Sequence, residues 1–133
     1  MSKGNESQKK IVIPCSGIGK AFGTVSREAT YLLIEELNPR EYRTMCLPLL
    51  VAGDEEAIKM LHSSVIVTID GCTKQCATVS VKKSGGAIKK EILVAKVLAA
   101  NRDHKPGTVL DIGEGGRLLA QDIANEITAE GGN

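Results

Sequence analysis

Short runs of β-branched residues alternate along this chain with segments of helical periodicity, and this alternation constrains the fold more than any other feature. The runs at 10–14 and 65–70 are rich in Ile and Val, as expected for strands buried on both faces. Further strands are expected at 42–47 and at 91–98, the latter being ambiguous between strand and helix. Strands that alternate with helices join through right-handed crossovers into a parallel sheet. The sequence therefore predicts an α/β fold: one three-layer, Rossmann-like domain with a mainly parallel sheet of about four strands.

Helical segments are expected between and after these strands, at 22–37, at 55–61, at 73–83 and from 115 onward. Asn38-Pro39 ends the first of them, because a residue before proline disfavours helical backbone. Asp54 is the natural N-cap of the second, and Gly85-Gly86 ends the third. Residues 48–53 are expected to form a connector.

Length and composition narrow the class of protein. The 133 residues suit one compact domain, here expected over residues 10–130 after a polar tail at 1–9. Aromatic residues make up only 2%, so the core must be aliphatic and few rings are available to stack on bases. With a net charge of +1 as well, a nucleic-acid partner is not expected. No secretory signal or membrane span is evident, so we expect a cytoplasmic protein with no membrane partner.

The local distribution of charge is less even than the total. Residues 82–105 carry a basic stretch, and the end of the chain is acidic. Such stretches are usually solvated faces. The alternative is that the segment 82–105 docks an acidic protein partner. The oligomeric state does not follow from these patterns.

The four cysteines stand where a parallel sheet would gather them. Cys15, Cys46 and Cys72 each follow a predicted strand, and Cys76 lies four residues beyond Cys72. The carboxyl ends of parallel strands share one edge of the sheet, and ligands bind at that edge. In a reducing cytosol, clustered cysteines are ligands or redox groups rather than structural disulfides. The sequence therefore predicts a site there, with a metal as its first candidate occupant.

The segment from Ile69 to Cys76 is the strongest local motif. Gly71 permits a sharp turn after the strand. Asp70 is expected to fix that turn through nearby backbone N–H groups, the alternative being that it orients a ligand. If the helix starts at once, Cys72 and Cys76 occupy positions i and i+4 on one face and can bind one metal ion. The N-terminus of that helix would also stabilise a thiolate at Cys72.

A glycine-rich loop follows Cys15. Its members Ser16, Gly17, Gly19 and Lys20 are predicted to line the cleft and to cradle an anion through backbone N–H groups. Cysteine-dependent phosphatases carry an arginine where this chain has Ala21. The adjacent lysine lacks the bidentate fork of arginine, and the spacing of a P-loop is absent.

Several kinds of thiol chemistry therefore stay open. A closed set of four thiolates would hold zinc, typically in a structural role. The same ligands could hold an iron–sulfur cluster, since softness alone does not separate the two. Alternatively Cys15 or Cys72 is the nucleophile of an enzyme, or of a redox or persulfide carrier, with a nearby thiol resolving it as a disulfide. His62 and His104 have polar neighbours and are expected at the surface, as alternative ligands at most.

Three separated motifs in this chain resemble the DGC domain family, whose members are regarded as zinc-binding proteins. They are Pro14-Cys15-Ser16-Gly17 with Gly19-Lys20, Leu47-Pro48-Leu49-Leu50-Val51-Ala52-Gly53, and Asp70-Gly71-Cys72 with Cys76. The Asp-Gly-Cys tripeptide gives the family its name.

The resemblance covers about residues 11 to 95 and implies a ligand set rather than a reaction. It implies that zinc is held by four family cysteines, which match Cys15, Cys46, Cys72 and Cys76 here. The sequence departs from the family pattern at Thr73, where proline is frequent, and its end from Asn101 onward is unmatched. The biological role stays undefined by the resemblance; a structural role, metal handling and service to a metalloenzyme system are the roles open to such a site.

Overall fold

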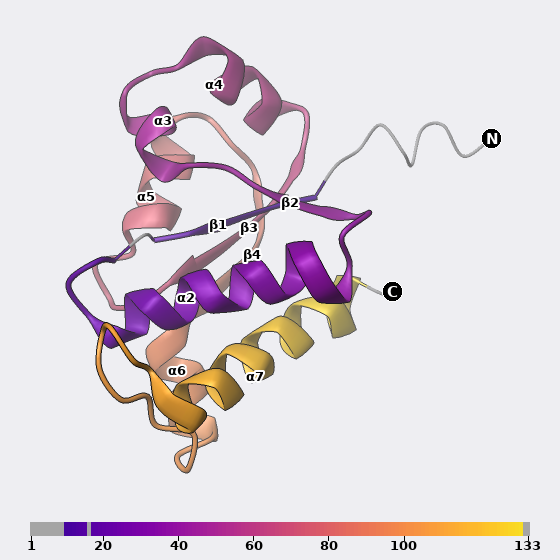
Figure 1. Cartoon of the computed structure of the whole chain (residues 1–133). Coiled ribbons are helices and arrows are strands. Elements are labelled where there is room, and N and C mark those ends of the chain that lie inside the picture. The colour runs from indigo at the N-terminus through magenta and orange to yellow at the C-terminus, as the bar shows by residue number, and fades with distance from the viewer. Residues whose placement is uncertain (1–9, 16, 132–133) are drawn as a thin grey trace.

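The structure, a computed structural model, describes residues 10–15 and 17–131. Its sheet has four strands, all parallel, in the order β2-β1-β3-β4. Helices cover both faces, which gives three layers (Figure 1). The predicted α/β class and mainly parallel sheet are confirmed. The expected tail at 1–9 and the loop residue Ser16 lie outside the described residues.

The elements follow one another in the expected alternation. The strands are β1 (Lys10–Pro14), β2 (Tyr42–Thr44), β3 (Val65–Asp70) and β4 (Ile88–Leu93). The helices are α2 (Ala21–Tyr31), continued by the π-helix η1 (Leu32–Leu37), then α3 (Leu47–Val51), α4 (Glu55–His62), α5 (Cys76–Lys83), α6 (Val94–Ala100) and α7 (Gly113–Gly131).

The strand order creates a switch point between β1 and β3. The chain leaves β1 toward β2 on one side, and it leaves β3 toward β4 on the other. The two central strands pair along the whole of β1, from Lys10 opposite Val65 to Pro14 opposite Ile69. In open α/β sheets, the crevice at such a switch point, beyond the carboxyl ends of the strands, is where ligands bind.

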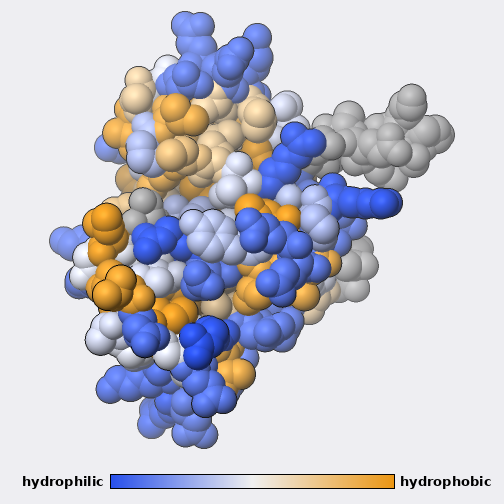
Figure 2. All heavy atoms as spheres, viewed as in Figure 1, coloured by the Kyte–Doolittle hydropathy of each residue, from blue (hydrophilic) through white to orange (hydrophobic). Residues whose placement is uncertain are grey.

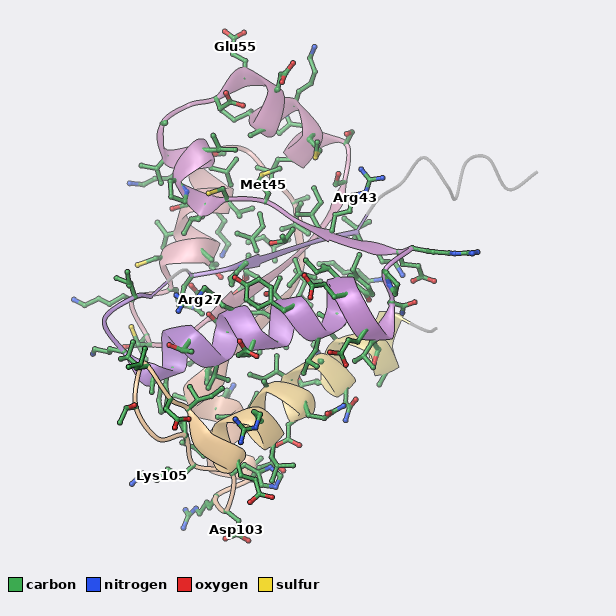
Figure 3. All side chains as sticks on the ribbon, in the orientation of Figure 1. Arg27, Arg43, Met45, Glu55, Asp103 and Lys105 are labelled. Carbon is green, nitrogen blue, oxygen red and sulfur yellow. The ribbon has the colours of Figure 1, made fainter. Side chains whose placement is uncertain are left out.

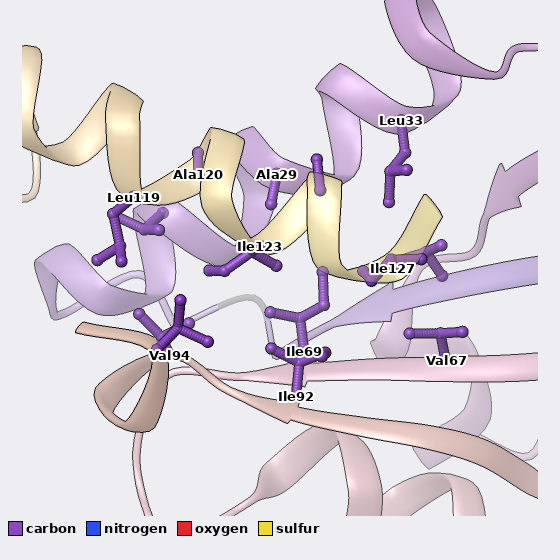
Figure 4. Packing of buried hydrophobic residues seen from close by; sticks show 14 of the residues in the cluster. Ala29, Leu33, Val67, Ile69, Ile92, Val94, Leu119, Ala120, Ile123 and Ile127 are labelled. Carbon is purple, nitrogen blue, oxygen red and sulfur yellow. The ribbon is translucent and has the colours of Figure 1, made fainter. Parts of the chain in front are cut away.

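Two aliphatic clusters hold the layers together. The first lies between the sheet and helices α2, α6 and α7, where Ile69 and Ile92 of the sheet share a buried cluster with Ile123 of α7 (Figure 4). The second lies on the opposite face, beneath α3, α4 and α5, and includes Ile13 and Leu61. Both faces of the sheet are therefore buried, which explains why the central strands are nearly continuous in Ile and Val.

The fourth strand differs from its prediction. It was expected at 91–98, but β4 ends at Leu93 and α6 begins at Val94. Val94 and Val97 are three positions apart and both are buried, so the helical period places them on one face. Alanines at the end of this segment favour a helix over a strand.

The expected connector at 48–53 also contains regular structure. Residues Leu47–Val51 form the short helix α3, with Cys46 as its N-cap residue. Pro48 stands in the first turn, where its missing N–H costs nothing because that group would have no intrahelical partner. Asp54 caps α4 as predicted, accepting a hydrogen bond from the N–H of Ala57 at 3.0 Å.

On the face shown in Figure 2, hydrophilic residues gather at both ends of the molecule and hydrophobic residues lie between them. Glu55 at one end of the molecule, and Asp103 and Lys105 at the other, point into solvent (Figure 3). Within the basic segment 82–105, Lys82 pairs with Glu91 at 3.4 Å and Lys90 pairs with Glu126 at 3.5 Å. Ion pairs at the protein surface such as these contribute little stability. Among the described residues, no helix combines the length and apolar character needed to cross a membrane.

Candidate functional site

A pocket of about 270 Å³ opens at the carboxyl ends of β1 and β3, at the switch point of the sheet. Three thiols line it, those of Cys15, Cys72 and Cys76. The other described lining residues come from the end of β3, the loops that follow β1 and β3, and the start of α2; they are Gly17, Gly19, Lys20, Phe22, Gly23, Asp70, Gly71 and Gln75. The structure therefore brings together three of the four predicted cysteines with most of the predicted loop.

Cys15 is held in place by the sheet and aims its sulfur at neighbouring polar groups. Its backbone N–H donates to the carbonyl of Ile69 at 2.9 Å, which extends the pairing of the two central strands by one residue. Its half-buried Sγ accepts a hydrogen bond from the N–H of Gly71 at 3.3 Å and lies 3.7 Å from the hydroxyl of Ser26. Sequence reasoning missed Ser26, a buried hydroxyl in the middle of an otherwise amphipathic helix.

Two glycines allow the loop after Cys15 to pack tightly against α2. A Cβ added at Gly23 would lie 2.0 Å from the carbonyl oxygen of Gly17, so no side chain fits at that position. A Cβ at Gly17 would come within 3.4 Å of the Cys15 sulfur. Gly19, in contrast, faces open space. Sequence reasoning selected Gly17 and Gly19 but missed Gly23, whose signal was a glycine in the first turn of a helix.

Asp70 has a larger role than the predicted local turn. Its side chain is buried, and its two carboxylate oxygens accept hydrogen bonds from the N–H of Ala77 at 2.7 Å and the N–H of Thr78 at 3.2 Å. The hydroxyl of Thr78 donates to the same carboxylate at 2.7 Å and lies 2.7 Å from the hydroxyl of Thr68. Asp70 thus satisfies N–H groups in the first turn of α5 and fixes the helix that Cys76 begins.

The predicted start of this helix at residue 73 is wrong. Helix α5 begins at Cys76, and Cys72 lies in the turn before it. Gln75 adopts a left-handed conformation with φ 53°, which interrupts a continuous helix from 73. Cys72 and Cys76 therefore do not share a helix face, although the turn still directs both of them to the same pocket.

Cys46 stands apart from the other thiols. It is exposed before α3 and is not among the residues that line the pocket. In the described parts of the chain, no group of three or more Cys, His, Asp or Glu side chains lies close enough to hold a metal ion. Thiolates are donors that zinc prefers, so the four thiols fit a zinc ion by their chemistry. Their spacing in the structure does not by itself form a metal site. The predicted four-cysteine ligand set thus stays a prediction.

The two histidines have partners of their own outside the pocket. His62 is exposed, and its Nε2 lies 2.8 Å from the carbonyl oxygen of Ser84. His104 is half-buried, and its Nδ1 lies 2.5 Å from a carboxylate oxygen of Asp122 on α7. Neither lines the thiol pocket.

Tyr42 is the described group with a shifted pKa, and it lies at the opposite, amino end of the sheet. It begins β2 and pairs with Lys10 of β1. Burial raises the pKa of its phenol above the ordinary 10.0, Lys10 opposes that shift, and Glu41 adds to it. This titration concerns stability rather than the thiol pocket.

Comparison with known families decides the assignment. The DGC domain model matches residues 11–114, most of the chain. The chain belongs to the DGC domain family. The searches of curated proteins and of solved structures each gave no match. The match reaches beyond the resemblance seen in the sequence and takes in the loop that precedes α7.

The structure gives each residue of the Asp-Gly-Cys tripeptide a distinct task. Asp70 caps α5, Gly71 donates its N–H to the sulfur of Cys15, and Cys72 lines the pocket. A Cβ at Gly71 would also come within 3.1–3.2 Å of atoms of Phe22 and Gly23, so the tripeptide packs closely on the start of α2. The tripeptide therefore joins the two loops that form the pocket.

Proposed function

We propose that this DGC domain protein binds a thiophilic metal ion, zinc in the first place, through the thiols of its switch-point pocket. The observation that supports this most is the convergence of Cys15, Cys72 and Cys76 on one pocket from two separate strand ends. Soft thiolate ligands select zinc and other thiophilic ions over magnesium or calcium.

Cys46 is the proposed fourth ligand. It follows β2, the neighbour of β1 in the sheet, and it precedes α3, which contacts α5. Since Cys46 is exposed and outside the pocket, its participation requires the segment around α3 to move toward the other thiols. With four thiolates the site would be closed and structural; with three, the metal would keep a position for water or a substrate.

The same ligands would accept an iron–sulfur cluster, and colour separates the two cases. A zinc protein is colourless, whereas a cluster absorbs visible light when the protein is purified without oxygen. The expected result is a colourless protein. Visible absorbance that disappears on exposure to air would show that the thiols hold an iron–sulfur cluster instead of zinc.

Metal analysis of purified protein, made without added metal, tests the proposal. We expect about one zinc per chain in the wild type and a sharp loss in Cys72→Ser, because a hydroxyl replaces one thiolate. The matched control is Thr73→Ala, which alters an exposed residue of the same turn and leaves every thiol in place. Unchanged metal content in Cys72→Ser would remove Cys72 from the ligand set.

The fourth ligand needs its own variant. If Cys46 binds the metal, Cys46→Ser lowers affinity in a competition with a chelator, while the fold, judged by circular dichroism, is kept. If Cys46→Ser holds zinc as tightly as the wild type, the site uses the pocket thiols alone.

A further inference from the structure

We propose that, in the metal-free protein, the pocket also carries out thiol–disulfide exchange, with Cys15 as the attacking thiol and Cys72 as the resolving thiol. This activity goes beyond metal binding and uses a small disulfide as its co-substrate. It depends on how the two thiols are placed, and a bound metal would block it by occupying both of them.

The environment of Cys15 singles it out among the four thiols. Its sulfur is half-buried at the wall of the pocket, where the N–H of Gly71 donates to it at 3.3 Å. A fixed N–H donor stabilises the negative charge that a sulfur carries as a nucleophile. No comparable donor contact is found for Cys46, Cys72 or Cys76 among the described residues.

Ser26 completes the surroundings of this sulfur. Its buried hydroxyl donates to the carbonyl oxygen of Gly23 at 2.6 Å and lies 3.7 Å from the Cys15 sulfur. In this arrangement the Cys15 thiol is the donor and the hydroxyl the acceptor. After loss of the thiol proton, rotation of the hydroxyl hydrogen would supply a second donor to the sulfur. Ser26 thus acts as a positioning residue for Cys15.

Cys72 is the thiol best placed to resolve an adduct on Cys15. It follows Gly71, whose N–H already contacts the Cys15 sulfur, so its Cα lies only about 3.8 Å from the Cα of Gly71. It also lies in the turn before α5 rather than in the helix, so a disulfide at Cys72 does not have to distort helical backbone to reach its preferred geometry. Cys76, in contrast, is fixed by the cap that Asp70 provides to α5.

The reaction balances in two steps. The Cys15 thiolate attacks one sulfur of a disulfide R–S–S–R, which forms a mixed disulfide on Cys15 and releases one R–S⁻. The Cys72 thiolate then attacks the Cys15 sulfur, which forms the Cys15–Cys72 disulfide and releases the second R–S⁻. The protein loses two electrons and the substrate gains them. A dithiol reductant reverses the sequence.

The pocket favours a small substrate. Its volume of about 270 Å³ falls just below the range of about 300–1,000 Å³ common for small-molecule sites. Phe22 and the glycines give it largely apolar walls, and Lys20 supplies the one cationic side chain among the described lining residues. A small, uncharged alkyl disulfide therefore suits it, and bis(2-hydroxyethyl) disulfide is the appropriate probe.

The test uses full-length protein, reduced and freed of metal with a chelator, then mixed with this probe and quenched with an alkylating agent. Peptide mass spectrometry should find the Cys15–Cys72 disulfide, with two equivalents of 2-mercaptoethanol released per chain. Cys72→Ser should stop at the mixed disulfide on Cys15 and release one equivalent. A disulfide that joins Cys15 to Cys76, or an adduct absent from Cys15 in Cys72→Ser, would overturn the assignment.

Cys46 serves as an internal reference for reactivity. Because Cys46 is exposed and Cys15 is half-buried, accessibility alone predicts that Cys46 reacts first. We expect the reverse, with Cys15 modified about tenfold faster in the native protein because the N–H of Gly71 donates to its sulfur, and with this advantage lost in urea. Faster modification of Cys46 in the native state would refute the proposal. Since metal is removed beforehand, this result and the zinc content are independent readouts.

Discussion

Replacement of Asp70 by alanine should destabilise this protein more than removal of an ordinary helix cap. The carboxylate is buried and accepts three hydrogen bonds, from the N–H groups of Ala77 and Thr78 and from the Thr78 hydroxyl. Alanine would leave both N–H groups in the first turn of α5 without their partner.

The magnitude follows from those three bonds. Hydrogen bonds to a charged group contribute about 1.5–3 kcal/mol each, and an unsatisfied buried donor costs about 1–3 kcal/mol. Since Thr78 can turn its hydroxyl toward Thr68, the loss falls mainly on the two N–H groups. We expect Asp70→Ala to lower the free energy of unfolding by about 3–5 kcal/mol, a large share of the roughly 5–15 kcal/mol of a typical domain.

The matched control is Asp54→Ala. Asp54 is exposed and accepts a single bond, from the N–H of Ala57 at 3.0 Å, so its loss should cost about 1 kcal/mol. Urea unfolding of the wild type and both variants, followed by circular dichroism at constant pH, gives the comparison. If Asp70→Ala is no more destabilised than Asp54→Ala, the account of how the tripeptide fixes α5 is refuted.

Two further predictions concern the pocket loop and pH. Gly23→Ala should lower the free energy of unfolding by about 2 kcal/mol or more, although alanine favours helices, because its Cβ would collide with the Gly17 carbonyl. Gly19 faces open space, so Gly19→Ala should leave stability unchanged in the same urea assay. Equal stabilities of the two variants would contradict the packing of Gly23 against Gly17. Burial raises the pKa of Tyr42 above 10.0, so the stability it contributes is complete below pH 10.0 and is lost as pH rises through the folded-state pKa. Tyrosinate absorbance in Tyr31→Phe should show this late titration, and a midpoint at or below 10.0 would contradict it.

Periodicity predicted most of the layers but not the ends of the elements. The strands at 10–14 and 65–70 could be predicted because both faces are buried, which makes them continuous in Ile and Val. The segment after Leu93 could not, because Val94 and Val97 fit a strand or a helix until the packing against α7 is known. The local sequence pattern alone does not decide between strand and helix for this segment, because tertiary packing decides it.

The same distinction applies to the site. Strand-end placement predicted that all four cysteines would gather at one edge of the sheet. Cys15 and Cys72 do line one pocket, because β1 and β3 are neighbours in the sheet. Cys46 also follows a strand, yet it stays outside that pocket. The helical pairing of Cys72 with Cys76 was wrong, because it depended on where α5 starts, and the left-handed Gln75 and the cap from Asp70 determine that start. Such contacts span several residues and leave no periodic signal.

X-ray absorption spectroscopy of the metal in protein purified without added metal is the sharpest test of zinc binding by the pocket thiols, because it identifies the element and its ligand atoms together. We expect about one zinc per chain, bound through sulfur at about 2.3 Å, with fewer sulfur ligands in Cys72→Ser. Less than about 0.2 metal per chain, with all four thiols open to alkylation, would contradict it.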